Sequence, residues 1–401
     1  MLNYRRKNLS DREIATLAPQ PQNVDTLLKS SEVSVIKCKS YNQDLIDRAV
    51  KSSIDNLGGL TQFVSAGMRV HIKPNLLTAK SPDKGATTHP TIIRAIVNQV
   101  MKLGGIVTIG DSPAGISRPI EEYWQKTGME KVAKETGAQL VRFEKSAVVE
   151  RHVNGNSYFI AKAVTDADLV INICKLKTHN LTLFTGAIKN MFGSVPGFKK
   201  SEYHKLAPRV DDFSKIVVDI FSATRPQLNI MDAVEVMEGN GPSAGKVTRL
   251  GLILAGKDAV ALDSIAAKLI GFEDGEISTT SEAYRRGLGE KDIEKMLIKG
   301  TALEEFQDLQ FALPSNRYMK YVPVSIVKIL GKMLWVRPKP DKKRCKKCEA
   351  CIKTCPTRAM TSDDGFPIIN YNKCISCFCC DEVCPHDAID QKMSWLVKKF
   401  R

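Results

Sequence analysis

Short apolar runs alternate with longer amphipathic segments through most of the chain. The short runs are rich in Val and Ile, as buried strands are, and the longer segments repeat their apolar residues at helical spacing. The expected strands are Val33–Cys38, Met68–Ile72, Ile106–Ile109, Leu140–Phe143, Leu169–Cys174, Leu228–Met231 and Leu250–Leu254. The expected helices are Gln43–Leu57, Pro90–Leu103, Arg118–Thr136 and Asp258–Ile270. This alternation predicts an α/β fold, a mostly parallel sheet with helices on both faces, in one domain or two lobes.

Most of the cysteines lie in two copies of one spacing near the C-terminus, C-x2-C-x2-C-x3-C-P. Bacterial-type ferredoxins hold two [4Fe–4S] clusters with this run, and the fourth cysteine of each run ligates the cluster of the other run. We therefore expect a small C-terminal α+β ferredoxin-like module with two [4Fe–4S] clusters. The first cluster is expected on Cys345, Cys348, Cys351 and Cys384. The second is expected on Cys374, Cys377, Cys380 and Cys355.

Zinc sites and disulfides are the alternatives for these cysteines. Paired zinc knuckles require neither a triple run nor the following proline, and disulfides require an oxidising compartment. Cys379 breaks the register of the second run, so we interpret it as a spare thiol, with a redox role as the alternative. Cys38 and Cys174 lie in apolar runs, where a free cysteine is usually a small buried hydrophobic residue.

The formal net charge of +15 is concentrated on both sides of the cysteine runs. Residues 314–344 hold nine basic residues and one acidic residue, and residues 391–401 hold four basic residues and no acidic one. Part of this charge offsets the negative clusters. Nucleic-acid binding is not expected, because few aromatic residues accompany the charge to stack on bases.

Tyr321–Val336 reads as a helix with a wide apolar arc and lysines on one face. It either packs against the body of the protein or lies on an anionic membrane with Trp335 and the lysines at the interface. Arg337-Pro338-Lys339-Pro340 ends this helix and is too stiff and short for a flexible linker, so the cysteine module should stay close to the body.

These patterns divide the chain into five segments. They are a polar N-terminal arm (1–30), an α/β domain (31–313), a basic amphipathic linker helix (314–344), a ferredoxin domain with two [4Fe–4S] clusters (345–390) and a basic tail (391–401).

Localisation is predicted from the N-terminus and from the thiolate chemistry. The basic residues at 1–7 are followed by polar residues rather than by the apolar core of a signal peptide. No run of eighteen uninterrupted apolar residues occurs, which argues against a spanning helix. We expect a reducing cytoplasm, with peripheral contact with an anionic membrane as a second possibility.

Polar residues follow several of the expected strands. Lys73, Asn75 and Asp111 follow two of them, and Lys175, Lys177 and His179 follow a third. Asp232 and Glu238 follow the strand that ends at Met231. Ligands of open α/β sheets bind outside the carboxyl ends of the strands, so these side chains predict one site.

The residue types suggest roles within that site. Lysines favour a ligand with a carboxylate or phosphate, while His179, Asp111 and Lys177 are the candidate catalytic residues for proton transfer. The alternative is that the lysines are solvated loop residues and that His179 is structural.

Several motifs occur in an order that resembles the iron–sulfur proteins grouped as domain of unknown function 362. They are Lys73-Pro74-Asn75, Ala86-Thr87-Thr88-His89-Pro90, Gly110-Asp111-Ser112-Pro113, Lys175-Leu176-Lys177-Thr178-His179, Thr185-Gly186-Ala187-Ile188-Lys189-Asn190, Met231-Asp232-Ala233, Glu238-Gly239-Asn240-Gly241-Pro242 and Asp258-Ala259-Val260-Ala261-Leu262-Asp263. The resemblance covers roughly residues 68–290 and implies an α/β domain and iron–sulfur binding. It adds His89, Lys189, Asn190 and Glu238 to the candidate ligand-binding residues.

Together these patterns predict an iron–sulfur electron-transfer protein with a redox partner protein. One interpretation is a ferredoxin-linked oxidoreductase that passes electrons from two [4Fe–4S] clusters to a small anionic ligand in the α/β domain. The other is a non-catalytic electron carrier or redox adaptor whose α/β domain binds a partner protein. In the first case, one cluster should face the α/β domain and the other should lie nearer solvent.

Overall fold

The computed structural model describes residues 31–115, 118–306, 309–317 and 335–399. The predicted polar arm (1–30) and residues 318–334 of the predicted linker helix (314–344) lie outside these residues. Within the described parts, no helix is long and apolar enough to cross a membrane.

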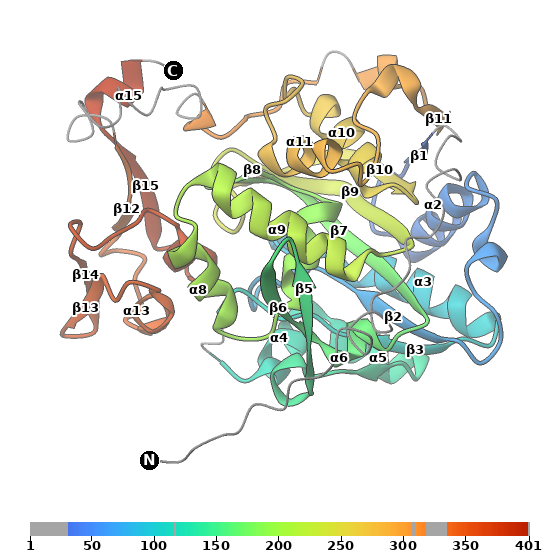
Figure 1. Ribbon diagram of the computed structural model, residues 1–401, viewed down its shortest axis with the longest axis horizontal. Helices are drawn as coiled ribbons and strands as arrows, with labels where there is room; N and C mark the ends of the chain where they lie inside the picture. Colours follow the sequence, from blue (N-terminus) through green and yellow to red (C-terminus); the bar gives the residue numbers. More distant parts are fainter. Residues whose placement is uncertain (1–30, 116–117, 307–308, 318–334, 400–401) are drawn as a thin grey trace. The chain divides into compact units, whose positions relative to one another are not determined.

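A nine-stranded sheet forms the centre of the described α/β region (Figure 1). Its strand order is β11-β1-β10-β9-β7-β2-β3-β4, and β8 pairs with β7. The bounds are β1 (Glu32–Lys37), β2 (Arg69–Lys73), β3 (Ile106–Ile109), β4 (Gln139–Leu140), β7 (Leu169–His179), β8 (Leu183–Thr185), β9 (Leu228–Glu238), β10 (Lys246–Gly256) and β11 (Leu297–Gly300). Neighbours from β9 through β4 are parallel, whereas β10 runs antiparallel to both β1 and β9. The predicted mostly parallel α/β sheet is confirmed.

Helices cover both faces of this sheet. Alternate residues of each strand point to opposite sides, and apolar residues on both sides are buried against helices. Ile171 and Ile173 of β7 belong to one apolar core, and Cys174 and Leu176 belong to the other. The first core is completed by α2 (Gln43–Asp55), α3 (Pro90–Lys102), α4 (Ile120–Thr127) and α5 (Met129–Thr136). The second is completed by α7 (Ala187–Asn190), α9 (Val210–Thr224), α10 (Ala259–Leu269) and α11 (Ser278–Arg285).

Two central strands are longer than the sequence predicts. The expected ends were Cys174 and Met231, but β7 continues to His179 and β9 to Glu238. Every residue of β7 is buried, including its lysines. The apolar pattern stops early because the polar side chains beyond it are buried against polar partners rather than solvated. The interpretation of these lysines as solvated loop residues is therefore wrong.

Smaller elements frame the sheet. The hairpin of β5 (Val148–Val153) and β6 (Asn156–Ala161) leads to α6 (Lys162–Thr165). Between α7 and α9, α8 (Lys199–Leu206) has buried and exposed residues without a regular apolar stripe.

The C-terminal residues form a small α+β module, as predicted. Its flanking strands β12 (Val336–Pro340) and β15 (Ile389–Met393) pair with each other, and so do β13 (Met360–Asp363) and β14 (Phe366–Ile369). Each cysteine run contributes one short helix, α13 (Ala350–Thr354) or α14 (Cys379–Glu382), and α15 (Trp395–Lys399) follows. Strand β12 lies within the range that the sequence assigned to the linker, so this strand is built into the module.

Candidate functional site

The two cysteine runs cross over in space as their spacing predicts. One cavity is lined by Cys345, Cys348, Cys351 and Cys384. A second cavity is lined by Cys355, Cys374, Cys377 and Cys380, together with Cys379. The fourth cysteine of each run thus lies with the first three of the other run. Ligation of the clusters by these two sets of four remains a prediction that this grouping supports.

The backbone around the cysteines suits bound thiolates. The amide of Ala359 donates to Cys355 Sγ at 3.2 Å, and the amide of Ala388 donates to Cys384 Sγ at 3.3 Å. Burial, followed by the neighbouring Cys384 and Cys348, raises the pKa of Cys351 to about 12. A thiol in such a place becomes a thiolate only beside a strong positive charge, which iron supplies. The residues therefore fit [4Fe–4S] clusters.

The same backbone is built twice. Left-handed residues occur at Lys347, Glu349 and Arg358 in the first run. In the second run they occur at Ser376, Phe378 and Asp387. Each left-handed residue of the second run lies 29 positions after its counterpart in the first run, and the cluster-binding cysteines of the two runs have the same offset. The repeated conformation wraps each loop around its cavity.

Two of the predicted lysines are neutralised by buried carboxylates. Lys73 Nζ lies 2.6 Å from Asp111 Oδ1, and Lys175 Nζ lies 2.9 Å from Asp232 Oδ2. Burial lowers the pKa of Lys73, and Asp111 only partly opposes this effect. Because both lysines already have a charged partner, neither is free to supply net positive charge to a ligand.

His89 belongs with the second of these pairs. Its ring stacks on Tyr41 with 3.7 Å between centroids, and its backbone amide donates to Asp232 Oδ2 at 3.0 Å. The Tyr41 hydroxyl donates to Asp232 Oδ1 at 2.8 Å and accepts from Lys175 Nζ at 2.7 Å. Burial, which outweighs Asp232, lowers the pKa of His89 to about 4. His89, Lys175, Asp232 and Tyr41 thus form a compact polar cluster with its hydrogen bonds satisfied internally.

Lys177 is also fully buried but has no carboxylate partner among the described residues. Its Nζ donates to Asn75 Oδ1 at 2.9 Å and to the carbonyl of Ala86. Asn75 in turn donates to Asn190 Oδ1 at 2.8 Å. Burial and the nearby Lys189 hold the pKa of Lys177 well below its ordinary value. A bound anion would offset this repulsion and favour the charged amine.

His179 connects β7 to the cysteine module. Its Nδ1 accepts the backbone amides of Leu181 and Thr182, so the ring proton must lie on Nε2. Nε2 lies 3.0 Å from Glu382 Oε1 on α14. Burial lowers the pKa of His179 to about 4. Burial is the largest single effect on Glu382 and opposes its ionisation, but His179, Lys189 and His204 together outweigh burial, so the pKa of Glu382 falls below its usual range. The pair is therefore a buried imidazole in close contact with a carboxylate.

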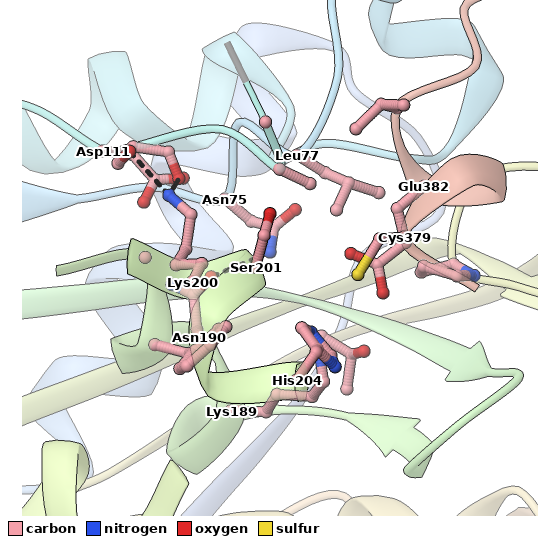
Figure 2. Close-up of a pocket in the computed structure, with 18 of the residues that line it drawn as sticks. Asn75, Leu77, Asp111, Lys189, Asn190, Lys200, Ser201, His204, Cys379 and Glu382 are labelled. Carbon is pink, nitrogen blue, oxygen red and sulfur yellow. Dashed lines mark hydrogen bonds between the residues drawn. The ribbon is translucent and has the colours of Figure 1, made fainter. Parts of the chain in front are cut away.

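A pocket with about 620 Å³ of empty space, part of it open to solvent, lies between the sheet and α14 (Figure 2). Five of the predicted site residues line it, namely Asn75, Asp111, Lys177, Lys189 and Asn190. The others lie outside its lining, namely Lys73, His89, Lys175, His179, Asp232 and Glu238. Glu238 instead accepts from the amide of Ala312 at the end of β9. The expected single site therefore divides into this pocket and the surrounding buried pairs.

Sequence reasoning missed half of the pocket. Two short helices contribute much of the additional polar lining, namely Lys200, Ser201, His204, Cys379 and Glu382, and Ser112, Thr185 and Thr354 add to it. Figure 2 shows Cys379 and Glu382 across the pocket from Asp111 and Lys200. Helix α8 has no periodic signal, and Glu382 follows no strand, so neither could be placed from the sequence.

Lys200 and His204 of α8 differ in whether their side-chain nitrogens already have hydrogen-bond partners. Lys200 Nζ donates to both oxygens of Ser112 and to the carbonyl of Val195, and burial lowers its pKa to about 8. His204 stacks on Phe213 with 4.0 Å between centroids, and its Nδ1 has no hydrogen-bond partner in the described structure. The three hydrogen bonds of Lys200 thus hold it in the pocket wall, whereas His204 Nδ1 is available to bind a ligand.

The pocket adjoins the second cysteine cavity. Cys379 lines both of them. Around it, Asn180 Nδ2 donates to Asp381 at 3.0 Å, the Ser243 hydroxyl donates to the Asp381 carbonyl at 3.0 Å, and Lys80 pairs with Asp387. The described structure therefore meets the expectation that one cluster faces the α/β domain. Cys348, in the other set, is exposed.

An α/β domain packed against a cysteine module of this kind defines an iron–sulfur protein of the electron-carrier type. This protein belongs to the family described as "Domain of unknown function (DUF362)", which matches residues 70–268, and a 4Fe-4S dicluster domain matches residues 337–385. It binds two [4Fe–4S] clusters.

Known proteins resemble different parts of the sequence. The "Thylakoid-associated protein sll1697" of Synechocystis sp. is 33% identical over 258 residues, which cover 64% of this chain and 79% of that protein. The B subunit of the anaerobic dimethyl sulfoxide reductase of Haemophilus influenzae is 49% identical over 47 residues, 11% of this chain and 23% of that subunit. The second likeness is confined to a small fraction of both proteins.

Two solved structures align with the chain. The lactate racemase apoprotein of Thermoanaerobacterium thermosaccharolyticum aligns with a TM-score of 0.38 and 13% identity, over 60% of this chain and 57% of that one. A Thermotoga maritima protein aligns with a TM-score of 0.36 and 13% identity, over 66% of this chain and 62% of that one. The chain thus spans less than two thirds of either structure.

Proposed function

We propose that this protein is a ferredoxin-linked oxidoreductase that passes electrons from its two clusters to a small anionic ligand in the pocket. One observation carries the proposal. The same pocket is lined by the lysines of the α/β domain and by Cys379 and Glu382 of the second cysteine run. A ligand there would lie beside the cavity of the second cluster, which favours electron transfer because its rate falls steeply with distance.

The protein side chains would bind and orient that ligand. Lys189 Nζ has no ion-pair partner in the described residues, and Lys177, once a bound anion favours its protonation, has one N–H beyond its two hydrogen bonds. These two amines would hold the negative group of the ligand, while Asn75 fixes the direction of Lys177. The clusters would supply single electrons.

Proton supply and the exclusion of water are the remaining tasks. His204 Nδ1 and the Thr185 hydroxyl are buried in the pocket lining without hydrogen-bond partners in the described structure. Either group can hydrogen-bond a ligand, and the imidazole can exchange a proton with it. Leu77, Phe192 and Val383 form apolar parts of the same lining and limit the water around the ligand.

Ligand-induced thermal shifts, measured anaerobically on the cluster-loaded protein, test this function. Inorganic phosphate, pyruvate and succinate serve as probes. At least one should raise the melting temperature of the native protein, and Lys177→Met or Lys189→Met should abolish that shift. Lys102→Met, at an exposed position, is the control. No shift with any probe, or unchanged shifts in both pocket variants, would contradict the anion site.

The second candidate is a redox adaptor without catalysis. Its support is that the short similarity to a dimethyl sulfoxide reductase falls on one subunit of that enzyme rather than on a whole enzyme. The two functions differ in the fate of the electrons. Clusters reduced under anaerobic conditions should be reoxidised by a bound pocket ligand if the protein is an oxidoreductase, and only by a partner protein if it is an adaptor.

Peripheral membrane contact remains a further proposal, which the thylakoid association in the name of the Synechocystis relative favours. The basic tail at 391–401 would bind anionic lipid, each lysine near the surface contributing about 1 kcal/mol within a Debye length. Binding to anionic vesicles should then weaken as salt is added. A cytoplasmic location stays a prediction.

A further inference from the structure

The two halves of the ferredoxin-type module carry opposite charge. The offset of 29 residues aligns Cys345–Arg358 with Cys374–Asp387. The first half holds four basic residues and one acidic residue, whereas the second holds three acidic residues and no Lys or Arg. Since the cysteine spacing and the left-handed positions are the same in both halves, cluster binding does not explain the difference.

The reversal falls on equivalent positions. Lys353 in the first half corresponds to Glu382 in the second, and Arg358 corresponds to Asp387. Glu382 lies 3.0 Å from His179, and Asp387 pairs with Lys80, so both acidic residues contact the α/β domain. Lys353 and Arg358 are exposed and have no ion-pair partner in the part of the chain that the structure describes. Two acidic residues of the second half thus contact the α/β domain, whereas the equivalent basic residues of the first half stay exposed and unpaired within the described residues.

The basic half supplies three of the four cysteines of the more accessible cluster site. Cys348 is exposed, while every other cysteine of the two sets is buried or partly buried. Further exposed cations follow the chain through the first run, namely Lys342, Lys343, Lys346 and Lys347. Of these, Lys347 pairs with Asp364, but Lys343 and Lys346 have no ion-pair partner within the described residues. An uncompensated basic face therefore lies where electrons can enter the first cluster.

We propose that the exposed Lys343, Lys346, Lys353 and Arg358, unpaired within the described structure, form together with the exposed Cys348 a basic face that binds the acidic face of an electron-donor protein. Complementary charge steers such encounters and fixes their orientation. One electron would leave a reduced donor cofactor and enter the first cluster, with no bond formed or broken. A redox protein is favoured over a lipid surface because Lys346 lines the same cluster cavity as the exposed Cys348. This docking requires only electron transfer, not the pocket ligand.

The test uses full-length, cluster-loaded protein and a reduced flavodoxin of strongly negative net charge as the probe. Binding is measured anaerobically by calorimetry, and cluster reduction by stopped-flow absorbance. The double variant Lys353→Glu/Arg358→Glu should weaken binding at least about tenfold and slow reduction by a similar factor, as loss of electrostatic steering does. Added salt should weaken native binding in the same direction.

Lys39→Glu, an exposed change in the α/β domain, should leave binding unchanged. The clusters of all variants should be reduced at the native rate by a neutral small-molecule mediator, and their iron content should stay the same. Equal affinity of the double variant and the native protein would overturn the docking face. So would binding of anionic vesicles, but not of flavodoxin, through the same four residues. The pocket thermal shifts in the double variant report separately on the proposed function.

Discussion

Lysine is rarely buried, yet Lys73, Lys175 and Lys177 are each at most 1% exposed. The first two are paired with carboxylates, and the third depends on neutral oxygen acceptors and an adjacent pocket. This difference in partners separates the two structural lysines from the candidate binding lysine within the predicted site. It also explains why the predicted roles of Lys73 and Lys175 in binding an anion lose support, while Lys177 keeps its role as a prediction.

We predict that Asp232→Asn destabilises the protein by about 3–5 kcal/mol, because it leaves the ammonium of Lys175 buried without its charged partner. Denaturant unfolding measured by circular dichroism checks this value. Lys175→Met/Asp232→Leu, which removes both charges, should recover most of the loss. If the single and double variants are equally unstable, the lost stability comes from packing rather than from an unpaired charge.

His71 provides a pH prediction away from the clusters. It is fully buried on β2, its Nδ1 lies 2.9 Å from the Thr108 hydroxyl, and burial followed by Lys73 lowers its pKa to about 3. The unfolded chain therefore takes up a proton near pH 6.5 that the folded chain does not take up until about pH 3. Stability should fall as pH decreases through this window.

His71→Asn removes this contribution. Its free energy of unfolding should fall with decreasing pH less steeply than that of the native protein, by about 1.4 kcal/mol per pH unit between about pH 6 and 5. Denaturant midpoints at these two pH values give the slopes. Parallel slopes would show that His71 is protonated in the folded state.

At the scale of elements, the sequence predicted where strands begin better than where they end. Ile106–Ile109 was predicted to the residue, and Met68–Ile72 within one residue. The ends of β7 and β9 were placed five and seven residues too early. Apolar patterning cannot detect a strand that continues through buried polar residues, because their partners come from distant segments.

The candidate site followed the same rule. Residues on the strands and on the helix after β8 could be found, because motifs and strand ends mark them. Helix α8 could not, because His204 lies in a polar, aperiodic sequence whose burial depends on packing against Phe192 and Phe213. The contribution of α14 required the contact between two modules, which no local pattern encodes.

The cysteine loops give a prediction at this scale. Native protein should contain two [4Fe–4S] clusters, hence eight iron and eight acid-labile sulfide per chain. Cys355→Ser should disturb the cluster held mainly by the second run, because Cys355 lines that cavity, whereas Cys384→Ser should disturb the other. Iron and sulfide analysis with paramagnetic resonance distinguishes the two losses. Stoichiometric zinc without sulfide, in anaerobically prepared protein, would refute cluster binding itself.

At the scale of the whole molecule, the proposed function depends on the contact between the cysteine module and the α/β domain. Glu382 is central to that contact because its Oε1 lies 3.0 Å from His179 Nε2 and its charge acts on Lys189. We predict that Glu382→Leu keeps the iron content but increases hydrogen exchange at the end of β7, around Thr178 and His179. Lys353→Leu, at the equivalent exposed position, should leave exchange there unchanged. Loss of iron in the Glu382 variant, or equal exchange in both variants, would contradict the docking role.

The near-identical backbones of the two halves have a consequence for assembly. Because the two halves are alike, either half could in principle pack against the same surface of the α/β domain. The reversed arrangement would place Lys353 and Arg358 against Lys80 and the pocket lysines, and like charges brought together cost several kcal/mol. The charge difference between the two halves thus favours one orientation of the module on the α/β domain during folding. Under the proposed donor docking, it would also determine which cluster receives electrons first.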